Sequence, residues 1–412
     1  MNLLAAENHA ERFLTAEYFQ DPYPTLKGFV EDAPVFWSKK ASAWIVSKFD
    51  AVEKGLASED LNASQRMLAA SSHLTEEERN RYSTILETLS NWIVFQDPPG
   101  HTRLRKLVNK SFTPRTIAAL EPRIVKIVND LLDEALTADV VDIAKNFTFK
   151  LPSAVMCELL GIPVERQWDL KRWSDGVAGF SAAARVNHQQ AEFANNMALE
   201  ANEYLFELFA HLRKEPGDNL LSRLLHPEDP SNALTEIELA GLVVQLFFAG
   251  FETTEGLMSN TIIALANNPE QEELLRQNPA LMEAAIEESL RFDSPILKQS
   301  RVASHDQMVD GVAIKAGDYV HFMIAGANRD PERFSNPDEF DIQRTDPGHV
   351  SFGHGIHFCI GAPLARLEAR IALDALMARV PKFEVLKPLP VYPELLAVRK
   401  PLELWIRNGK SA

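Results

Sequence analysis

The chain has 412 residues, of which 46% are apolar and 24% are charged, and its formal net charge is −16. That charge excludes nucleic acid as the principal partner, because phosphate binding needs a basic surface. The N-terminus lacks the basic flank of an export signal, and no run reaches the roughly 18 apolar residues of a membrane-spanning helix. We therefore expect a cytoplasmic protein, monomeric and without a membrane partner.

The elements expected along the chain change character twice. Residues up to about 95 are mixed, residues from about 96 to 290 are mainly helical, and residues from about 291 to 412 hold short strands, an irregular stretch and a last helix. No linker separates these regions, so we expect one mainly α domain, 1–412, with a minor β region. The predicted strands and last helix are Val35–Trp37, Ala43–Val46, Val312–Ile314, Tyr319–Ile324 and Leu364–Val380.

A single long helix is predicted between Leu234 and Asn268. Thr235 and Glu238 form a capping-box sequence, and Leu234 with Leu239 can form the flanking hydrophobic staple. No proline intervenes before Pro269. The helix would have about 33 residues and a length of roughly 50 Å, enough to cross a whole domain.

The middle of that helix, Ala249–Thr254, has an unusual composition for a buried span. Gly250 costs about 1 kcal/mol of helix stability relative to alanine. The threonines can bond back to carbonyls and bend the helix, and Glu252 places a charge among apolar residues. The segment is either a functional site or a tolerated irregularity on a solvated face.

The two cysteines differ in their surroundings. Cys157 lies in an apolar run, Leu151–Leu160, where a buried small hydrophobe is expected. Cys359 follows Gly353 and Gly355 in a predicted tight turn and precedes a helix whose first turn contains Pro363. A helix N-terminus favours a thiolate, so Cys359 is either a nucleophile or an axial haem ligand. A structural disulfide between the two cysteines is not expected.

Two other readings of the Cys359 turn are disfavoured. His354 and His357 lie nearby, but neither a second cysteine nor a histidine pair at ligand spacing completes a zinc site. The two glycines also lack the third glycine and the preceding strand of a dinucleotide-binding turn.

The turn resembles the haem-binding loop of the cytochrome P-450 family, and four other segments resemble motifs of that family in the same order. The resemblance runs from residue 97 to about 400. The segments are Phe352-x-x-Gly355-x-His357-x-Cys359-x-Gly361, Ala249-Gly-x-Glu252-Thr253-Thr, Glu288-x-x-Arg291, Phe340-Asp-Ile-Gln-Arg344 and Asp97-Pro-Pro-Gly-His101-x-x-x-Arg105.

The resemblance implies a cytochrome P-450 fold with the long helix across haem b (iron protoporphyrin IX), Cys359 as the iron ligand, and Glu252 with Thr253 as a proton-delivering acid–alcohol pair. It implies a buried structural network of Glu288, Arg291 and Arg344. Further expected haem contacts are His101, Arg105, Ala249, Gly250, Arg301, Phe352, His357 and Gly361. Expected substrate-pocket residues are Gln245, Phe248, Leu297, Gln299 and Ala397.

The cysteine loop is the most specific of the five segments that carry the resemblance. Glu-x-x-Arg also occurs at Glu76–Arg79, Glu78–Arg81 and Glu273–Arg276, where ordinary i,i+3 ion pairs on helix surfaces are expected. The His101 and Arg105 pair taken alone would fit a solvated helix face.

The implied activity is that of a haem-thiolate monooxygenase that inserts one oxygen atom from O2 into a lipophilic small molecule. No flavin or iron–sulfur segment is found, so electrons from NAD(P)H are expected to arrive through a ferredoxin or flavodoxin with its reductase. The basic stretch Arg103–Arg115 is a candidate dock for such an acidic partner; the alternative is an ordinary charged helix face. That stretch carries Arg103, Arg105, Lys106, Lys110 and Arg115.

Three alternatives stay open. The same haem could serve a peroxygenase or a rearranging or dehydrating enzyme, although peroxide-using members often lack the acid–alcohol pair. A non-catalytic haem-binding protein and a cysteine hydrolase are the others. The substrate is not readable, since residues 62–92 and 164–200 hold no motif; Gly176, Gly179 and Ala182–Ala184 suggest only a mobile lid.

Overall fold

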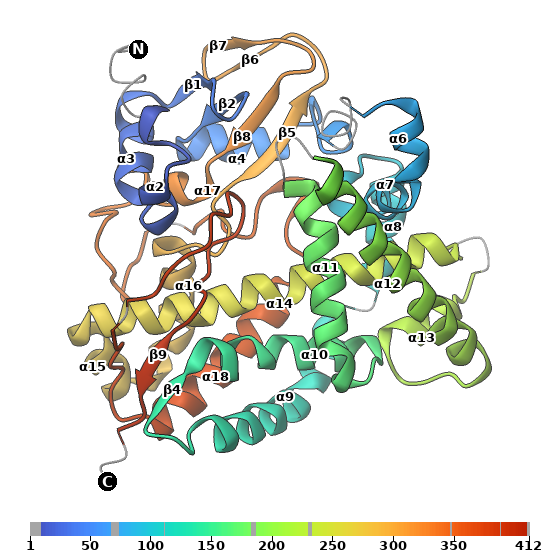
Figure 1. Cartoon of the computed structure of the whole chain (residues 1–412). Helices are drawn as coiled ribbons and strands as arrows, with labels where there is room; N and C mark the ends of the chain where they lie inside the picture. The colour runs from blue at the N-terminus through green and yellow to red at the C-terminus, as the bar shows by residue number, and fades with distance from the viewer. Residues whose placement is uncertain are drawn as a thin grey trace. The chain divides into compact units, whose positions relative to one another are not determined.

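The computed structural model describes residues 10–66, 74–110, 112–182, 187–229, 233–346, 348–387 and 389–409 (Figure 1). The chain divides into two compact units made of interleaved segments. Unit 1 comprises Met1–Leu61, Leu120–Pro152 and Glu252–Ala412, and unit 2 comprises Asn62–Ala119 and Ser153–Phe251. The expectation of a single domain stays a prediction.

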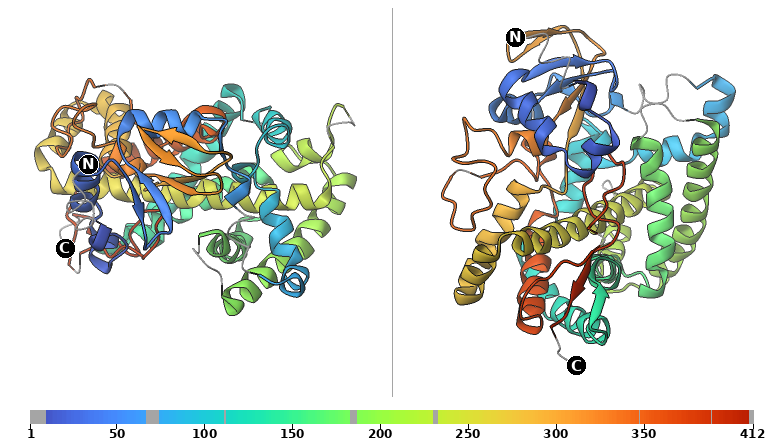
Figure 2. Two further views of the ribbon diagram at one scale, coloured as in Figure 1. Left: turned by 90° about the horizontal axis from the view of Figure 1, so that it is seen from above. Right: turned by 60° about the vertical axis from the view of Figure 1, so that its left-hand side comes forward.

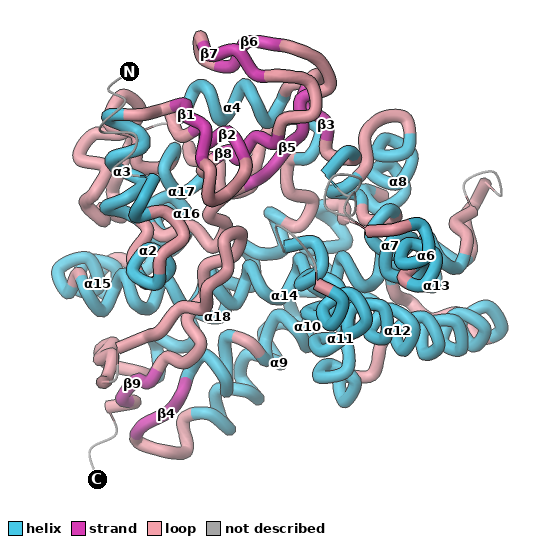
Figure 3. The backbone as a smooth tube through the Cα atoms, turned by 45° about the horizontal axis from the view of Figure 1, so that its top comes forward, coloured by secondary structure: helices cyan, strands magenta, loops and turns pink. Residues whose placement is uncertain are grey.

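A five-stranded sheet, in the order β1-β2-β8-β5-β3, forms the β part of unit 1 (Figure 3). Strands β1 and β2 are antiparallel, β2 runs parallel to β8, and β8 runs antiparallel to β5. The strands predicted at 35–37 and 43–46 are confirmed, whereas the one predicted at 319–324 ends at Phe322, because Ile324 begins a helical turn, α17. The strands are β1 (Val35–Ser38), β2 (Ala43–Val46), β3 (Leu61–Asn62), β5 (Gln299–Ala303) and β8 (Tyr319–Phe322).

Both faces of this sheet are buried. Successive side chains along a strand point to opposite faces, and apolar cores cover both. Val46 and Phe322 point to a core shared with helix α4 (Phe49–Ala57), while Ile45 and Phe36 point to a second core shared with helices α2 and α3. A Cβ on Gly55 of α4 would lie 2.2 Å from the Phe322 ring. Glycine at this position therefore lets α4 lie directly on β8.

The remaining elements of unit 1 are helices, helical turns and two small two-stranded sheets, β4-β9 and β6-β7. The strand predicted at 312–314 is confirmed as β7. These elements are α2 (Ala16–Gln20), α3 (Tyr23–Asp32), β4 (Val140–Asp142), a π-helical turn (Ala144–Thr148), α15 (Pro269–Gln277), a 3₁₀ turn (Pro279–Leu281), α16 (Met282–Phe292), β6 (Gln307–Val309), β7 (Val312–Ile314), α17 (Ile324–Ala327), a 3₁₀ turn (Gly355–His357), α18 (Ala362–Arg379) and β9 (Trp405–Arg407).

Unit 2 is helical in the part that the structure describes. Helices α11 and α12 lie side by side (Figure 2), and Gly176 permits this contact, because a Cβ there would lie 2.5 Å from the Met197 side chain. Ala183 and Ala184, expected in a lid, lie outside the described residues. The elements are α6 (Glu76–Arg81), α7 (Ser83–Ser90), a 3₁₀ turn (Ile93–Phe95), α8 (Gly100–Asn109), a 3₁₀ turn (Val164–Arg166), α11 (Gln167–Ala182), α12 (His188–Lys214) and α13 (Leu220–Leu225).

Three helices contribute residues to both units: α9 (Pro114–Ala135), α10 (Lys150–Leu160) and α14 (Glu236–Asn267). Helix α14 confirms the predicted long helix, and its capping box is present, with Thr235 N donating to Glu238 Oε2 at 2.8 Å and Glu238 N donating to Thr235 Oγ1 at 3.2 Å. By length and composition α14 could cross a membrane, which corrects the expectation that no segment could. Two thirds of its most apolar window, 67%, is buried inside the protein, as in a core helix.

Candidate active site

The loop before α18 places Cys359 at the start of that helix. Gly353 and Gly355 adopt positive φ values of 74° and 70°, which L side chains rarely adopt. The turn closes through the Cys359 amide, which donates to the Phe352 carbonyl at 2.8 Å. Gly361 caps α18, so the Cys359 thiol, which is partly exposed, lies beside the helix N-terminus.

Close packing explains why two of these positions need glycine. A Cβ on Gly355 would lie 2.9 Å from the Ala57 Cα at the end of α4. A Cβ on Gly353 would lie 3.1 Å from Gln299 Nε2. Gln299, expected in the substrate wall, therefore lies against the cysteine loop.

The donor set around Cys359 suits a metal group that brings its own ligands. Within the described ranges, no group of three or more His, Cys, Asp or Glu side chains could hold a metal ion. One thiolate at a helix N-terminus cannot complete the coordination of a bare ion, but it is sufficient for haem iron, whose macrocycle supplies the equatorial ligands. The residues present thus fit haem.

Cationic and aromatic side chains accompany the thiol. The Arg366 guanidinium lies 4.4 Å from the centroid of the Phe352 ring. The pKa of Arg366 is raised, first by its hydrogen bond to Glu287 and also by the nearby Cys359. Arg301 on β5 is buried, with 3% of its surface exposed, and its Nη1 donates to the Ser300 carbonyl at 2.8 Å. His357 ends the 3₁₀ turn in the loop.

Six expected site residues belong to unit 2, where the contacts of Gln245, Phe248 and Gly250 are structural. Gln245 Oε1 accepts from the Ile93 amide at 2.7 Å, the Phe248 ring stacks on Trp92, and a Cβ on Gly250 would lie 2.5 Å from Met156 Sδ. The other three are His101, which is buried, Arg105, which is half-buried one turn later on α8, and Ala249, which is exposed.

Leu297 and Ala397 lie together in unit 1. The Leu297 amide donates to the Ala397 carbonyl at 2.9 Å. The Leu297 side chain is buried in the core shared with α2 and α3. Its role as a pocket residue stays a prediction.

Glu252 and Thr253 follow Phe251 on α14. Glu252 is buried and pairs with Lys400, whose Nζ lies 3.1 Å from Glu252 Oε1 and 2.7 Å from Glu255 Oε2. Thr253 is half-buried. Sequence reasoning missed Lys400 and Glu255, although two acids three residues apart in an apolar helix already require a nearby cation.

The structure brings Glu288, Arg291 and Arg344 into one buried network. Both Glu288 oxygens accept from Arg291 at 2.7 Å, and Arg344 Nε lies 3.1 Å from Glu288 Oε2. The prediction of i,i+3 ion pairs at the other Glu-x-x-Arg sequences was partly wrong. Arg81 bonds Glu192 on α12 instead, and Arg276 bonds Glu272, its i,i+4 partner.

Cys157 behaves as predicted. It is buried in α10, and burial raises the pKa of its thiol to about 12, with a further contribution from Glu165. Neither cysteine forms a disulfide, as expected.

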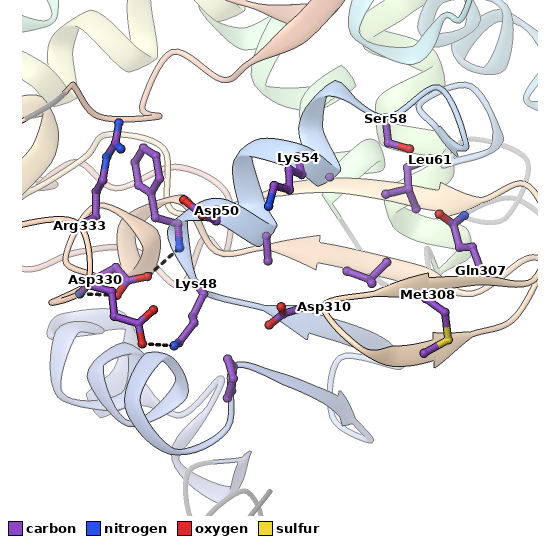
Figure 4. A pocket seen from close by; sticks show the side chains of 16 residues that line it. Lys48, Asp50, Lys54, Ser58, Leu61, Gln307, Met308, Asp310, Asp330 and Arg333 are labelled. Atoms are coloured by element: carbon purple, nitrogen blue, oxygen red, sulfur yellow. Dashed lines mark hydrogen bonds and ion pairs between the residues drawn. The ribbon is translucent and has the colours of Figure 1, made fainter.

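A hollow of about 750 Å³ lies along α4 and the β6-β7 hairpin, lined mainly by charged and polar side chains such as Lys54, Gln307 and Asp310 (Figure 4). At one end Lys48 pairs with Glu332. Cys359 does not line this hollow, so its contents would not reach the thiol.

Comparisons with known proteins identify the family of the chain. Residues 59–389 match the family model described as Cytochrome P450. Cytochrome P450 107B1 of Saccharopolyspora erythraea is 40% identical over 344 residues, 82% of each chain, and vitamin D(3) 25-hydroxylase of Pseudonocardia autotrophica is 36% identical over 405 residues, 97% of this chain and 96% of the relative.

A solved structure gives the same result for the fold. P450BioI, in complex with hexadec-9Z-enoic acid ligated acyl carrier protein, superposes with a TM-score of 0.88 and 33% identity, covering 95% of this chain and 100% of that one. The chain belongs to the cytochrome P450 family and is a P450 monooxygenase.

Proposed function

We propose that the protein is a cytoplasmic haem-thiolate monooxygenase that hydroxylates or epoxidises a lipophilic small molecule. The observation that carries this proposal is the Cys359 thiol, held in a glycine turn at the N-terminus of α18, in a chain whose described ranges hold no group of three or more His, Cys, Asp or Glu side chains for a bare metal ion. When bound, haem b supplies the site at which O2 is reduced and split.

Nine residues would hold the haem. Cys359 would ligate the iron as a thiolate, stabilised by the α18 N-terminus and by Arg366. The buried Arg301 guanidinium suits a carboxylate, so Arg301 would bind a propionate together with His357. By resemblance, His101 and Arg105 would do the same from α8. Phe352, Ala249, Gly250 and Gly361 would contact the ring.

Proton delivery is assigned to Glu252 and Thr253. Splitting O2 consumes two protons, and these must arrive without opening the site to bulk water. Glu252 is buried and ionisable, and Thr253 beside it offers a hydroxyl that can accept and donate a proton at once. Glu252 would pass protons from solvent to the Thr253 hydroxyl.

Electrons would come from NAD(P)H through a ferredoxin or flavodoxin with its reductase. The exposed cations Lys106, Lys110 and Arg115 support docking of such an acidic partner. Arg103, included in the predicted patch, instead pairs with Glu238.

The substrate is proposed to be lipophilic on two grounds. Gln245, the one polar side chain expected in the pocket from α14, already accepts a backbone hydrogen bond. The relatives include an enzyme named for vitamin D(3) and a P450 solved with a fatty acyl carrier protein. Gln299, Leu297, Ala397 and Phe248 stay candidate pocket residues.

The test is spectroscopic and chemical. Haem-loaded protein, reduced under carbon monoxide, should give the strongly red-shifted Soret band of thiolate ligation, and Cys359→His should lose it. A library of sterols, macrolides and fatty acids is then turned over with a ferredoxin system under isotopically labelled O2, and the product should carry one labelled atom. Turnover with hydrogen peroxide alone would favour the peroxygenase alternative, and an unshifted Soret band would overturn the proposal.

A further inference from the structure

A buried cluster of one lysine and two glutamates occupies the middle of α14. Glu252 and Glu255 lie three residues apart on one face of the helix. The Lys400 ammonium bonds both, at 3.1 Å to Glu252 Oε1 and at 2.7 Å to Glu255 Oε2. Each of the two glutamates is 6% exposed and Lys400 is 8% exposed. Two carboxylates thus share one cation with little access to water.

The position of Lys400 is fixed by its backbone neighbours. A Cβ on Gly256 would lie 2.9 Å from the Arg399 carbonyl oxygen, so glycine lets this segment lie against α14. The Asn260 amide donates to the same carbonyl at 3.3 Å, and the Arg399 side chain pairs with Asp293 at 2.8 Å. Arg399, the residue before Lys400, is therefore held through both its backbone and its side chain, and the Lys400 ammonium contacts both glutamates.

The ammonium stays charged. Burial alone would lower the pKa of Lys400, but Glu255 and Glu252 outweigh burial and raise this pKa to about 12. A buried cation needs at least one partner, because leaving a charge unpaired in the interior costs a free energy of several kcal/mol. With Glu255 at the shorter distance, the bond to Glu252 can open while the cation keeps one carboxylate.

We propose that Lys400 and Glu255 form a permanent buried ion pair to which Glu252 docks between proton transfers, which makes Lys400 and Glu255 positioning residues for Glu252. Glu252 leaves the ammonium when it takes up a proton from hydronium in the solvent, which leaves neutral water behind. It gives this proton to the Thr253 hydroxyl, whose own proton passes to dioxygen as the redox partner's electrons reduce it. The Glu252 carboxylate, again charged, then returns to Lys400.

This inference rests on the proposed function of Glu252 and makes an unusual prediction for Glu255. In Glu255→Gln the ammonium loses its shorter carboxylate contact, so Glu252 is held more tightly and releases protons more slowly. Turnover should fall by about tenfold with a larger solvent isotope effect, corresponding to a barrier increase of about 1.4 kcal/mol. In a Lys400→Met background the Lys400 ammonium no longer holds Glu252. Because Glu255 acts on Glu252 through Lys400, Glu255→Gln should then change turnover by less than about twofold.

The experiment combines this kinetic cycle with a readout that does not use turnover. Urea midpoints of the holoproteins should fall in Lys400→Met, and adding Glu255→Gln to it should lower the midpoint no further, because the removed charges were paired with each other. Lys400→Arg should restore most of the turnover. Lys48→Met, which removes the Lys48–Glu332 pair at the hollow of Figure 4, is the control and should leave turnover and isotope effect unchanged.

The outcomes separate the two proposals. If the wild type makes no product with any donor, the proposed function is wrong, and the urea cycle still decides whether Lys400 and Glu255 are a permanent pair. If the wild type turns over but Glu255→Gln slows it equally with and without Lys400, or leaves the isotope effect unchanged, then the positioning role is wrong.

Discussion

Unit 1 buries two charged clusters that differ in how completely they are paired. In the first, all three guanidinium nitrogens of Arg291 and of Arg344 donate hydrogen bonds, to Glu288, Asp346 and backbone carbonyls. In the second, a single ammonium, that of Lys400, serves both Glu252 and Glu255. Every guanidinium nitrogen of the first cluster donates a hydrogen bond, whereas in the second cluster two carboxylates share the Lys400 ammonium.

This difference separates a structural cluster from one that can change state. A buried network whose every group is bonded gives its segments one arrangement, because any alternative leaves a charge without a partner. Arg291 and Arg344 thereby tie α16 to carbonyls of residues 335–339. A shared cation has two nearly equivalent pairings, so one carboxylate can leave without stranding it.

The largest effect is expected from breaking the saturated cluster. Arg291→Met leaves Glu288 buried and removes five hydrogen bonds. The free energy of unfolding should fall by about 3–5 kcal/mol, measured by urea denaturation, or the protein should fail to fold and bind haem.

A matched control exists on α6. Arg81 has the same Glu-x-x-Arg spacing, but it pairs on the surface with Glu192, and both side chains are more than half exposed. Arg81→Met should cost less than about 1 kcal/mol. Equal losses in Arg81→Met and Arg291→Met would contradict the structural role of the Glu288 network.

The second effect should be on rate rather than on stability. Thr253→Val removes the hydroxyl that would relay protons, so product formation should fall by about 100-fold, within the range for lost acid–base groups. The carbon monoxide spectrum and urea midpoint should stay near those of the wild type. Thr254→Val changes the next residue, also a threonine and buried, and should keep most of the turnover; a similar loss in both variants would assign the effect to packing.

The cysteine loop could be predicted from the sequence because its determinants are local. Gly353, Gly355, Cys359 and Gly361 lie within nine residues, and the turn and the helix that they specify follow directly from backbone preferences. The sheet strands were readable for the same reason. The four consecutive apolar residues of 43–46 favour a strand buried on both faces, and the two cores confirm it.

The partner of Glu252 could not be predicted in this way. Lys400 lies 145 positions from Glu255 in the sequence. It reaches α14 because Gly256 leaves room for the Arg399 backbone and the Asn260 side-chain amide donates to the Arg399 carbonyl. Such a contact depends on tertiary packing rather than on a local pattern. Likewise, the sequence marked Gly250 as unusual without revealing that Met156 fills the space beside it.

A third, smaller effect should appear at acid pH. Glu287 bonds Arg366 at 2.6 and 2.8 Å and His349 at 3.3 Å. Burial alone would raise the pKa of Glu287, but Arg366 and His349 outweigh burial and lower this pKa to about 2. Because the folded value lies below the ordinary 4.5, this pair stabilises the fold above about pH 4.5 and loses that stabilisation as pH falls toward 2.

Glu287→Gln should therefore flatten the acid limb of the stability curve. Urea midpoints measured between pH 6 and pH 3 (roughly the window that the lowered pKa defines) should fall less steeply in the variant than in the wild type. The effect should be modest, since water reaches both side chains, with Glu287 42% and Arg366 38% exposed. Parallel curves for the two proteins would show that this pair, unlike the two buried clusters, contributes no stability of its own.

The smallest effect on the fold, and a selective one on electron supply, is expected at the fully solvated charges. Lys106 and Lys110 are exposed on and just after α8, so Lys106→Glu with Lys110→Glu should leave the urea midpoint and substrate binding nearly unchanged. Reduction by ferredoxin should slow by about tenfold at low ionic strength, and salt should shrink the difference. The control is the double variant Lys39→Glu with Lys382→Glu, which changes two exposed lysines elsewhere and alters the net charge equally. Comparing the stopped-flow reduction rates of the two double variants separates docking from overall repulsion. Equal slowing in both double variants would mean that only the net charge of the protein matters. A docking surface is sensitive to the position of each charge, whereas the buried clusters are sensitive to how each charge is paired.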